Sequence, residues 1–444
     1  MKWSKYNYIY FSNKFNKHLL YNSLSNSFID ISNPDLLEYL NELKNKENID
    51  ELPDNPELFE DLKKSKIFVE SDETEFLKIK HSVLYNRYSS NTVVLTVLPT
   101  LSCNFKCPYC FVEQKSVFMK KDIYKRIKLL LKNVAINNKM TFLHLTWMGG
   151  EPLLNFEGIK ELTKMLVKPN IKLTANVVTN GYLLTKEVVE QLPQLNITRL
   201  QVTIDGLETE HNQTRIHKTD NNSFQKIINN LDFFFEKYNK PDDISINIRV
   251  NLARNSNYVK KFLEVYSFLR QRYKNENFYI SPGFIEDIKM NGKNISCEFD
   301  KAALKDFYTT MVAAGLTNFS MYPRNYPYEC AVRSPNCFVI GPSGELYSCW
   351  ENIGHKTNII GHLDEKGIPI IDNETALLRY FTGADYLSDN ECQECFAFPI
   401  CTGGCPEKRI RNKYDNAQFN VCSLYKENID DMLDLHYSTK ITCS

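Results

Sequence analysis

The chain has 444 residues, of which 43% are apolar and 24% are charged, an ordinary composition for a globular protein with two or three domains. Its 54 basic residues equal its 54 acidic residues, so no overall field would attract nucleic acid or an anionic membrane. No apolar stretch approaches the length of a membrane span, and residues 1–17 lack the apolar core of a signal peptide. We therefore expect a cytoplasmic protein with no nucleic-acid or membrane partner. In that compartment, its 13 cysteines are more typical of metal ligands than of disulfides.

Residues 1–90 have the pattern of a small α+β module. Strand-like segments at residues 6–10, 19–21 and 28–31 precede two short helices, which Asn33-Pro34 and Asn55-Pro56 would begin as N-cap and first helical residue. This order resembles the winged-helix element at the front of many peptide-modifying enzymes, which binds a leader peptide as an added strand. A wing that only packs on the rest of the protein is the alternative.

From about residue 92 to residue 284 a strand and a helix alternate six times. Alternation of this kind predicts an α/β fold with a parallel sheet and right-handed crossovers, here a partial (β/α)6 barrel. Chemistry in such folds gathers at the carboxyl ends of the strands. The predicted strands are residues 93–98, 142–147, 173–178, 200–204, 244–250 and 278–281, and the helices include residues 123–134, 224–235 and 258–269.

Three cysteines follow the first predicted strand directly, in Cys103-Asn-Phe-Lys-Cys107-Pro-Tyr-Cys110. They supply three thiolates where a closed tetrahedral site needs four, so one coordination position is open for a ligand that reacts. From the residues alone, a zinc loop that borrows a distant fourth ligand and a ferredoxin-like cluster remain open as alternatives.

Further polar and glycine motifs follow the next strands and should lie on the same rim. Gly149-Gly150-Glu151 follows the second strand, and the glycines would let a ligand approach the backbone closely. A turn that needs glycine only for its geometry is the alternative. Asn180 follows the third strand and Thr203 closes the fourth.

The cysteine motif, with Tyr109 before its last cysteine, resembles the cluster motif of the radical SAM superfamily. The resemblance implies that the three thiolates hold a [4Fe–4S] cluster whose open iron is chelated by S-adenosylmethionine. It implies cofactor contacts from Tyr109, with Gly149, Gly150 and Glu151 at the methionine ammonium, Asn180 and Thr203 at the ribose and amino-acid portions, and Arg215 at the carboxylate. Such enzymes cleave the cofactor to a 5′-deoxyadenosyl radical that abstracts hydrogen from an unactivated carbon.

Two neighbouring positions are less well defined by the resemblance. Asn212 stands where many members of the family have aspartate, so its role is open. Arg249, on the fifth predicted strand, could contact cofactor or substrate, or could form a salt bridge that faces a helix.

Eight further cysteines are concentrated in the last third of the chain, enough for two fully ligated [4Fe–4S] clusters or two zinc sites. The segment Cys401-Thr-Gly-Gly-Cys405 and the spacing of the upstream cysteines closely resemble the SPASM domain of radical SAM enzymes. The resemblance implies one auxiliary cluster on Cys330, Cys337, Cys349 and Cys405, and a second on Cys392, Cys395, Cys401 and Cys422. Cys297 and Cys443 are left over and are expected to be unliganded thiols.

We therefore expect four parts: a winged-helix-like peptide-recognition module at residues 1–90, the radical SAM barrel at 91–290, a linker at 291–329 and a SPASM domain with two auxiliary clusters at 330–444. The resemblance implies an oxidoreductase that matures a ribosomally made precursor peptide carrying a leader sequence, most simply by closing a thioether or other side-chain crosslink. A flavodoxin or ferredoxin would donate electrons.

Three alternatives remain open at this point. One is a maturase that oxidises a sulfatase residue to formylglycine; such enzymes resemble this chain but carry an aspartate proton acceptor where Trp350 stands here, next to Glu351. Another is a peptide epimerase. The last is a degenerate iron–sulfur carrier or peptide-binding scaffold without catalytic activity.

Overall fold

The computed structural model describes residues 1–441 apart from 47, 50–55, 89–90, 139, 241–243, 256, 275–277, 291–292, 297–298, 317–318, 320–321 and 326–328. Cys297 and Cys443 lie outside the described residues. The chain forms two compact units, which are not continuous in sequence. Unit 1 comprises Met1–Ser89, Lys301–Ser334 and Arg379–Ser444, and unit 2 comprises Ser90–Asp300 and Pro335–Leu378. The predicted four-part division remains a proposal.

Unit 2 is built on a ten-stranded sheet in the order β11-β10-β9-β8-β7-β6-β14-β15-β16-β17. Strands β6 to β11 are parallel to one another, and β14 is parallel to β6. From β14 to β17 the sheet continues as an antiparallel meander. The parallel strands are β6 (Thr92–Val97), β7 (Phe142–Trp147), β8 (Lys172–Thr179), β9 (Ile197–Thr203), β10 (Ser245–Leu252), β11 (Phe278–Phe284) and β14 (Cys337–Ile340). The short antiparallel strands are β15 (Glu345–Tyr347), β16 (Gly361–Leu363) and β17 (Pro369–Ile371), with a separate hairpin of β12 (Asp287–Met290) and β13 (Lys293–Ser296).

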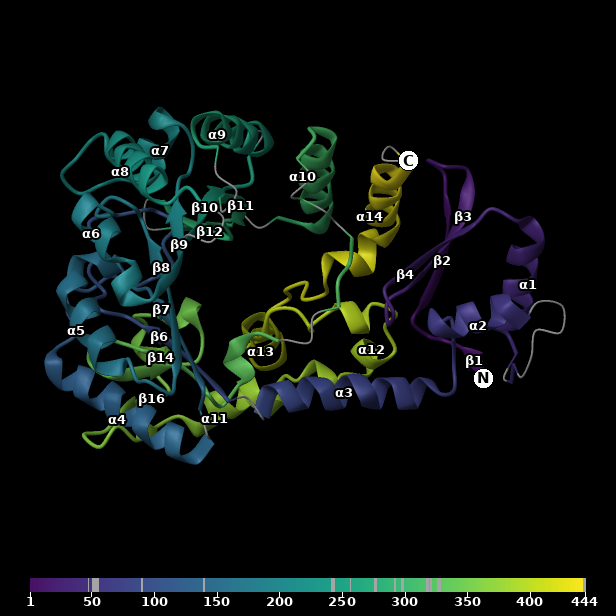
Figure 1. The fold of residues 1–444 in the computed structure, drawn as a ribbon, viewed down its shortest axis with the longest axis horizontal. Coiled ribbons are helices and arrows are strands. Elements are labelled where there is room, and N and C mark those ends of the chain that lie inside the picture. The colour runs from purple at the N-terminus through teal and green to yellow at the C-terminus, as the bar shows by residue number, and fades with distance from the viewer. Residues whose placement is uncertain are drawn as a thin grey trace. The chain divides into compact units, whose positions relative to one another are not determined.

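The crossover helices of unit 2 lie on the outer side of this sheet in Figure 1. They are amphipathic: α8, for example, buries Phe224, Ile227, Leu231 and Phe234 at helical spacing. The helices are α4 (Lys121–Asn138), α5 (Phe156–Leu166), α6 (Lys186–Gln191), α7 (Glu208–Thr214), α8 (Ser223–Lys237) and α9 (Tyr258–Arg272), and α11 (Glu374–Leu378) follows β17.

The six strands and three helices predicted for the barrel are confirmed. The strand β7 has the predicted bounds. The largest difference among the strands is three residues, at the start of β9 and the end of β11, and the largest among the helices is four residues, at the end of α4. The α/β fold class and the partial (β/α)6 barrel are therefore correct.

The two faces of the parallel sheet differ in polarity. On β10, buried Ile246, Ile248 and Val250 alternate with partly exposed Asn247 and Arg249. Parallel sheets covered on both faces usually have continuous apolar strands, so this alternation indicates that one face is not covered by helices. Arg249 is on that second face, opposite to the buried side chains, which excludes the salt bridge facing a helix.

Unit 1 begins with an antiparallel sheet in the order β2-β3-β4, followed by three helices. Asn33 caps the first helix as predicted, because its side chain accepts a hydrogen bond of 2.8 Å from the backbone N–H of Asp35. Pro56 begins the second helix as predicted, whereas Asn55 lies outside the described residues. The elements are β2 (Asn7–Ser12), β3 (Lys17–Asn22), β4 (Ser27–Ile31), α1 (Pro34–Lys44), α2 (Pro56–Lys64), α3 (Asp72–Tyr88), and the paired short strands β1 (Lys2–Trp3) and β5 (Phe68–Val69).

Both faces of the β2-β3-β4 sheet are covered. On one face Leu20 and Ile31 pack with residues of α1 and α2, such as Leu40 and Phe59. On the other face Tyr10, Leu19 and Tyr21 pack with residues from the end of the chain, which are Ala397, Ile400, Ile429 and Leu433. The remaining helices of unit 1 are α10 (Lys301–Ala313), α12 (Asn390–Gln393), α13 (Pro406–Tyr414) and α14 (Leu424–Ile441).

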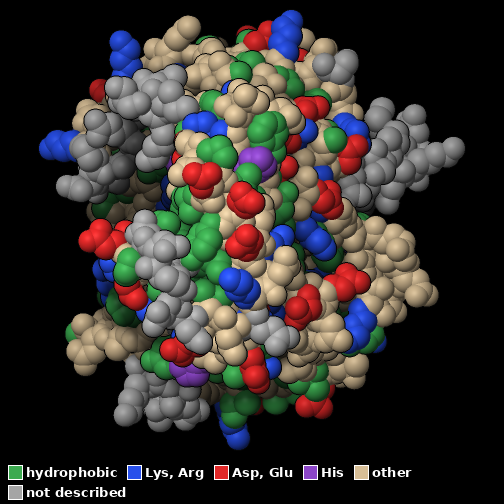
Figure 2. All heavy atoms as spheres, turned by 90° about the vertical axis from the view of Figure 1, so that its right-hand side faces the viewer, with side chains coloured by type: hydrophobic (Ala, Val, Ile, Leu, Met, Phe, Trp, Pro, Cys, Tyr) green, Lys and Arg blue, Asp and Glu red, His purple; other side chains and the backbone are tan. Residues whose placement is uncertain are grey.

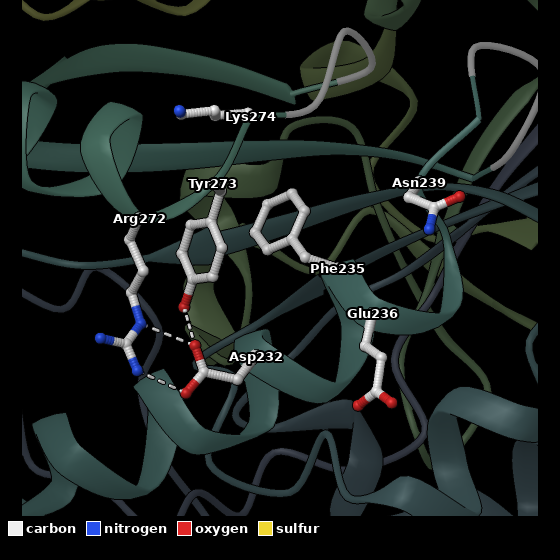
Figure 3. Close-up of a pocket in the computed structure, with 7 residues that line it drawn as sticks. All are labelled: Asp232, Phe235, Glu236, Asn239, Arg272, Tyr273 and Lys274. Atoms are coloured by element: carbon white, nitrogen blue, oxygen red, sulfur yellow. Dashed lines mark hydrogen bonds and ion pairs between the residues drawn. The ribbon is translucent and has the colours of Figure 1, made fainter.

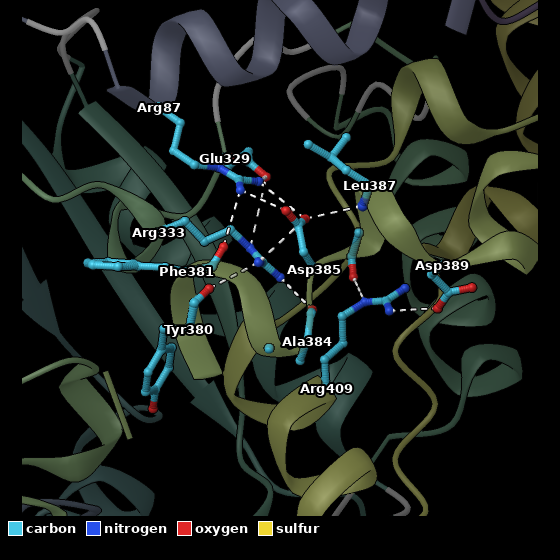
Figure 4. Close-up of polar contacts among 12 residues, drawn as sticks. Arg87, Glu329, Arg333, Tyr380, Phe381, Ala384, Asp385, Leu387, Asp389 and Arg409 are labelled. Atoms are coloured by element: carbon cyan, nitrogen blue, oxygen red, sulfur yellow. Dashed lines mark hydrogen bonds and ion pairs between the residues drawn. The ribbon is translucent and has the colours of Figure 1, made fainter. Parts of the chain in front are cut away.

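A buried ionic network joins the end of α3 to two later segments of unit 1 (Figure 4). Arg87 binds Glu329 through two hydrogen bonds of 2.7 Å and Asp385 through bonds of 2.7 and 3.2 Å. The three side chains are 2%, 7% and 9% exposed. Burial lowers the pKa of the Arg87 guanidinium, but the two carboxylates outweigh burial and leave it above its ordinary value. Arg333 lies beside them, 3.6 Å from Asp385, and donates to the carbonyls of Tyr380 and Ala384.

The distribution of charge on the surface agrees with the equal numbers of basic and acidic residues. Basic and acidic side chains are interspersed on the face shown in Figure 2. Within the described ranges, no helix combines the length and the apolar character that crossing a bilayer requires.

Candidate active site

The loop between β6 and α4, residues 98–120, carries Cys103, Cys107 and Cys110 and is called the cysteine loop below. It is held at both ends by backbone hydrogen bonds, including Leu101 with Val117 and Lys115. Its middle pairs with the segment after α7, since the backbone N–H of residue 106 donates to residue 216 and that of residue 218 donates to residue 104. The cysteine positions are therefore fixed by two parts of unit 2.

Gly149 and Gly150 lie directly against the cysteine loop. Gly150 N–H donates to the Thr100 carbonyl at 3.1 Å, and Glu151 N–H donates to the Ser102 carbonyl at 2.9 Å. Gly149 has a φ of +135°, and a Cβ on Gly150 would come within 2.2 Å of the Ser102 oxygen. The two glycines thus bring the end of β7 into backbone contact with the residues just before Cys103.

Glu151 is fully buried and links the ends of β7 and β8. Its carboxylate accepts hydrogen bonds from the Thr179 hydroxyl at 2.7 Å, the Asn180 N–H at 2.8 Å and the Leu153 N–H at 3.1 Å. Burial raises the pKa of Glu151, and these hydrogen bonds partly offset the rise. The carboxylate already has three protein partners, so its predicted contact with the methionine ammonium would be made from this fixed position.

Asn180 reaches the cysteine loop from the end of β8. Its amide nitrogen donates to the Asn104 side chain at 2.7 Å and lies 3.9 Å from the Cys103 sulfur. Thr203, at the end of β9, is 8% exposed and is paired in register with Arg249. Arg249 donates from Nε to the Asn251 side chain at 3.0 Å.

Tyr109 is the centre of a buried polar network. Its hydroxyl donates to the Asp205 carboxylate through a short hydrogen bond and accepts from Arg215 at 2.9 Å and Asn251 at 3.3 Å. The Arg215 guanidinium also lies over the Phe105 ring, 5.5 Å from its centroid. The network ties the aromatic position of the cysteine motif to the ends of β9 and β10.

Electrostatics within this network are dominated by burial. Burial lowers the pKa of the Arg215 guanidinium, but Tyr109, Cys107 and Asp205 outweigh it, so the group stays charged. Burial raises the pKa of Cys103 to about 12, and Glu151 adds to the rise. The Cys103 thiol would therefore become a thiolate most readily on a cationic centre.

The donor atoms around the cysteine loop fit an iron–sulfur cluster with a charged organic ligand. No three His, Cys, Asp or Glu side chains in the described part of the chain converge as they would on a single metal ion. A cluster spreads its thiolates over several irons, and three cysteines of one loop match that donor chemistry. Beside them, Arg215 Nε and Asp205 Oδ1 are buried and have no hydrogen-bond partner among the described residues. These two atoms offer one hydrogen-bond donor and one acceptor to a ligand that carries both an anionic and a cationic group.

All the residues predicted for this site lie at the carboxyl ends of β6 to β9 or in the segment after β9. The structure adds Asn104 and Asn251, which the sequence did not single out as site residues. The alternation on β10 was the available signal for Asn251, two positions after Arg249 on the same face. Asn212, whose role the resemblance left open, accepts a hydrogen bond of 3.1 Å from the Phe224 N–H at the start of α8.

In unit 1, the four cysteines of the second predicted auxiliary set are neighbours. The pKa of Cys392 is raised to about 11, mainly by burial and also by Cys401. The pKa of Cys395 is raised mainly by burial and also by Cys401 and Cys422. Of the first predicted set, Cys330 and Cys405 belong to unit 1 and Cys337 and Cys349 to unit 2. The ligand assignments of both sets remain proposals.

A surface hollow of about 310 Å³ in unit 2 lies away from this chemistry (Figure 3). It is formed where α8 and α9 end, on the side where β10 and β11 begin. One of its two acids, Asp232, is already paired with Arg272 at 2.6 Å and with the Tyr273 hydroxyl at 2.8 Å. Because ligands of open α/β sheets bind at the opposite, carboxyl end, the hollow is not the active site. Its lining residues are Asp232, Phe235, Glu236, Asn239, Arg272, Tyr273 and Lys274.

Residues 97–264 match the family model described as the Radical SAM superfamily. The chain therefore contains a radical SAM domain and is a radical SAM enzyme, as the cysteine motif predicted. It is 25% identical to the cysteine-type anaerobic sulfatase-maturating enzyme of Clostridium perfringens over 369 residues, 75% of this chain and 94% of the relative.

Two solved structures share the fold. The structure of native anSMEcpe with bound AdoMet and Cp18Cys peptide superimposes with a TM-score of 0.56 at 18% identity, covering 79% of this chain and 98% of the other. Streptococcus suis SuiB superimposes with a TM-score of 0.50 at 14% identity, covering 95% and 100%. The cofactors predicted from the motifs, S-adenosylmethionine and [4Fe–4S] clusters with auxiliary clusters in addition, are those of SPASM-type radical SAM enzymes.

Proposed function

We propose that the chain matures a ribosomally made precursor peptide by hydrogen abstraction and closes a crosslink, most simply a thioether to a peptide cysteine. The observation that carries the proposal is the residue after Cys349. Sulfatase maturases carry an aspartate proton acceptor there, and here Trp350 donates its indole N–H to the Thr96 hydroxyl at 2.9 Å. A base for the sulfatase reaction is thus missing at that position, whereas crosslinking to a thiol does not depend on it.

The N-terminal sheet supports a peptide substrate with a leader. Since α1 and α2 cover one face and the end of the chain covers the other, a peptide can join this sheet only at an edge. Strand β4 is an edge strand that pairs only with β3 among the described residues. A leader segment would add to β4 through main-chain hydrogen bonds.

Each site residue has a role in this proposal. Cys103, Cys107 and Cys110 would hold the cluster that binds S-adenosylmethionine, and the bound pair would supply the means to abstract hydrogen from an unactivated carbon. Arg215 would pair with the methionine carboxylate. The backbone at Gly149 and Gly150 would admit the cofactor, and Glu151, Asn180 and Thr203 would orient it, all three from the ends of β7 to β9. The eight later cysteines would hold two auxiliary clusters, with a flavodoxin or ferredoxin as electron donor.

Sulfatase maturation is the second candidate function, favoured by the alignment with the clostridial relative over 94% of its length. One experiment separates the two. The anaerobically reconstituted chain is incubated with S-adenosylmethionine, dithionite and either the precursor peptide encoded next to it or a sulfatase-derived cysteine peptide. We expect the precursor to lose two hydrogens per crosslink and the sulfatase peptide to stay unchanged. Formylglycine in the sulfatase peptide, without change in the precursor, would replace the first proposal by the second.

Two controls complete the experiment. The Cys103→Ala, Cys107→Ala, Cys110→Ala variant should form no 5′-deoxyadenosine, because it lacks the predicted cluster ligands. Repeating the reaction in deuterated water identifies epimerisation, which would incorporate deuterium without loss of mass. Wild-type chain that forms no 5′-deoxyadenosine with any peptide would contradict catalysis and favour a carrier or scaffold.

A further inference from the structure

Arg409, on α13, connects three parts of the cysteine-rich end of the chain. Its Nη2 lies 2.8 Å from the Cys392 sulfur, its Nη1 lies 3.0 Å from Asp389 Oδ2, and its Nε donates to the Gly403 carbonyl at 2.5 Å. Figure 4 shows the guanidinium directed at the Asp389 carboxylate. The side chain is only 11% exposed. Each of the three guanidinium nitrogens thus has a partner, and one of these partners is a thiol of the second predicted auxiliary set.

The neighbouring contacts fix this arrangement. Asp389 Oδ2 holds the guanidinium, while its Oδ1 accepts the Cys392 N–H at 3.2 Å. Gly403 lies between Cys401 and Cys405 and has a φ of +78°. Arg409 therefore cannot turn away from Cys392 without giving up its other two partners.

A second cation lies at the other end of the same ligand set, where Lys426 Nζ is 3.7 Å from the Cys422 sulfur. Arginine stays charged under all conditions in which proteins are folded, and it donates in a rigid fork. A fixed positive charge and N–H···S hydrogen bonds both favour the more negative state of a cluster. Net charge and hydrogen bonds to sulfur are two of the main determinants of cluster potential.

We propose that Arg409 is a positioning residue that holds Cys392 as a cluster ligand and raises the reduction potential of the cluster on Cys392, Cys395, Cys401 and Cys422. This rests on the proposed function, which assigns an iron–sulfur cluster to those four cysteines. Reduction of such a cluster by a flavodoxin or ferredoxin, or by dithionite in a titration, would add one electron and one negative charge, break no ligand bond and need no proton. Arg409 makes this step more favourable by lying against a thiolate that gains electron density.

Four variants of the full chain test the proposal, each in the Cys103→Ala, Cys107→Ala, Cys110→Ala background so that the cofactor-binding cluster does not contribute. Arg409→Gln removes the charge, and Arg409→Lys keeps the charge without the fork. Asp389→Asn removes the opposing carboxylate but keeps an acceptor for the Cys392 N–H. Arg411→Gln is the matched control, because Arg411 is on the same helix and lies over the Phe419 ring, 4.6 Å from its centroid.

The readouts are iron and sulfide content and a redox titration followed by electron paramagnetic resonance. We expect Arg409→Gln to move one auxiliary midpoint to lower potential, Arg409→Lys to move it less, Asp389→Asn to move it to higher potential, and Arg411→Gln to leave it in place. If Arg409→Gln loses the iron of one cluster while Arg411→Gln keeps it, the positioning role is supported. The effect on the reduction potential is then measured in Arg409→Lys.

Two results separate the failure of this inference from that of the proposed function. Full iron content with an unchanged midpoint in Arg409→Gln would overturn the role of Arg409 and leave the clusters intact. Zinc, or no iron, at the auxiliary cysteines of the parent chain would overturn the cluster assignment itself.

Discussion

Replacing Arg87 with methionine should destabilise unit 1 strongly. The side chain neutralises Glu329 and Asp385, which are 7% and 9% exposed and would be left in the interior without their main cation. Removing one partner of a buried ion pair costs about 3–5 kcal/mol. Arg333 lies 3.6 Å from Asp385 and 3.9 Å from Glu329 and would compensate in part, which places the expected cost near about 3 kcal/mol.

Hydrogen exchange followed by mass spectrometry measures this cost locally. Arg87 is near the end of α3, so a loss of about 3 kcal/mol should speed exchange of the α3 amides by roughly a hundredfold where exchange follows opening equilibria. The control is Lys64→Met, because Lys64 and Asp61 are 76% and 71% exposed and such pairs contribute about 0–1 kcal/mol. Adding Asp385→Asn to Arg87→Met should recover part of the loss, since it removes one unpaired charge. Equal exchange in the Arg87 and Lys64 variants would refute the reasoning.

Three further predictions concern unit 2. His144 is half-buried and neutral, and burial lowers its pKa, so the unfolded chain binds a proton that the folded chain does not. Stability should fall as pH drops below about 6.5, and less steeply in His144→Gln, as denaturant midpoints at several pH values would show. Gly150→Ala should reduce iron content because its Cβ meets a backbone carbonyl of the cysteine loop. Gly315→Ala should not, because it strains a backbone with φ of +79° but its Cβ meets no atom within 4 Å, so it controls for strain without the contact. Tyr109→Phe removes the hydroxyl that accepts a hydrogen bond from Arg215. We expect the S-adenosylmethionine concentration that half-saturates 5′-deoxyadenosine formation to rise roughly ten- to a hundredfold, and an unchanged half-saturating concentration would contradict this role.

The barrel was predictable because its signals are local. Apolar alternation and helical spacing can be read in windows of a few residues, and the cysteine motif and the glycine pair lie directly after strands. The orientation of Arg249 could be settled only with the strand register, since either face of β10 was compatible with one polar residue among apolar neighbours.

The features missed depend on partners far apart in sequence. The helix α3 was not predicted, because its apolar residues follow no single stripe and its end is held by Glu329 and Asp385. Arg409 stands among charged residues after Cys405, and only the fold shows that it lies against Cys392. The packing of the N-terminal sheet on residues 397–433 likewise has no sequence signal.

That packing has a consequence for synthesis and for engineering. The apolar side of the β2-β3-β4 sheet is translated more than 350 residues before Ala397, Ile400, Ile429 and Leu433, which cover it. That side of the sheet therefore cannot be covered until the segment that packs on it has been translated, and exposed apolar surface of this kind is prone to aggregate. For the same reason, an exchange of the N-terminal sheet with that of a relative, made to test the proposed leader binding, would have to include the C-terminal residues that pack on it.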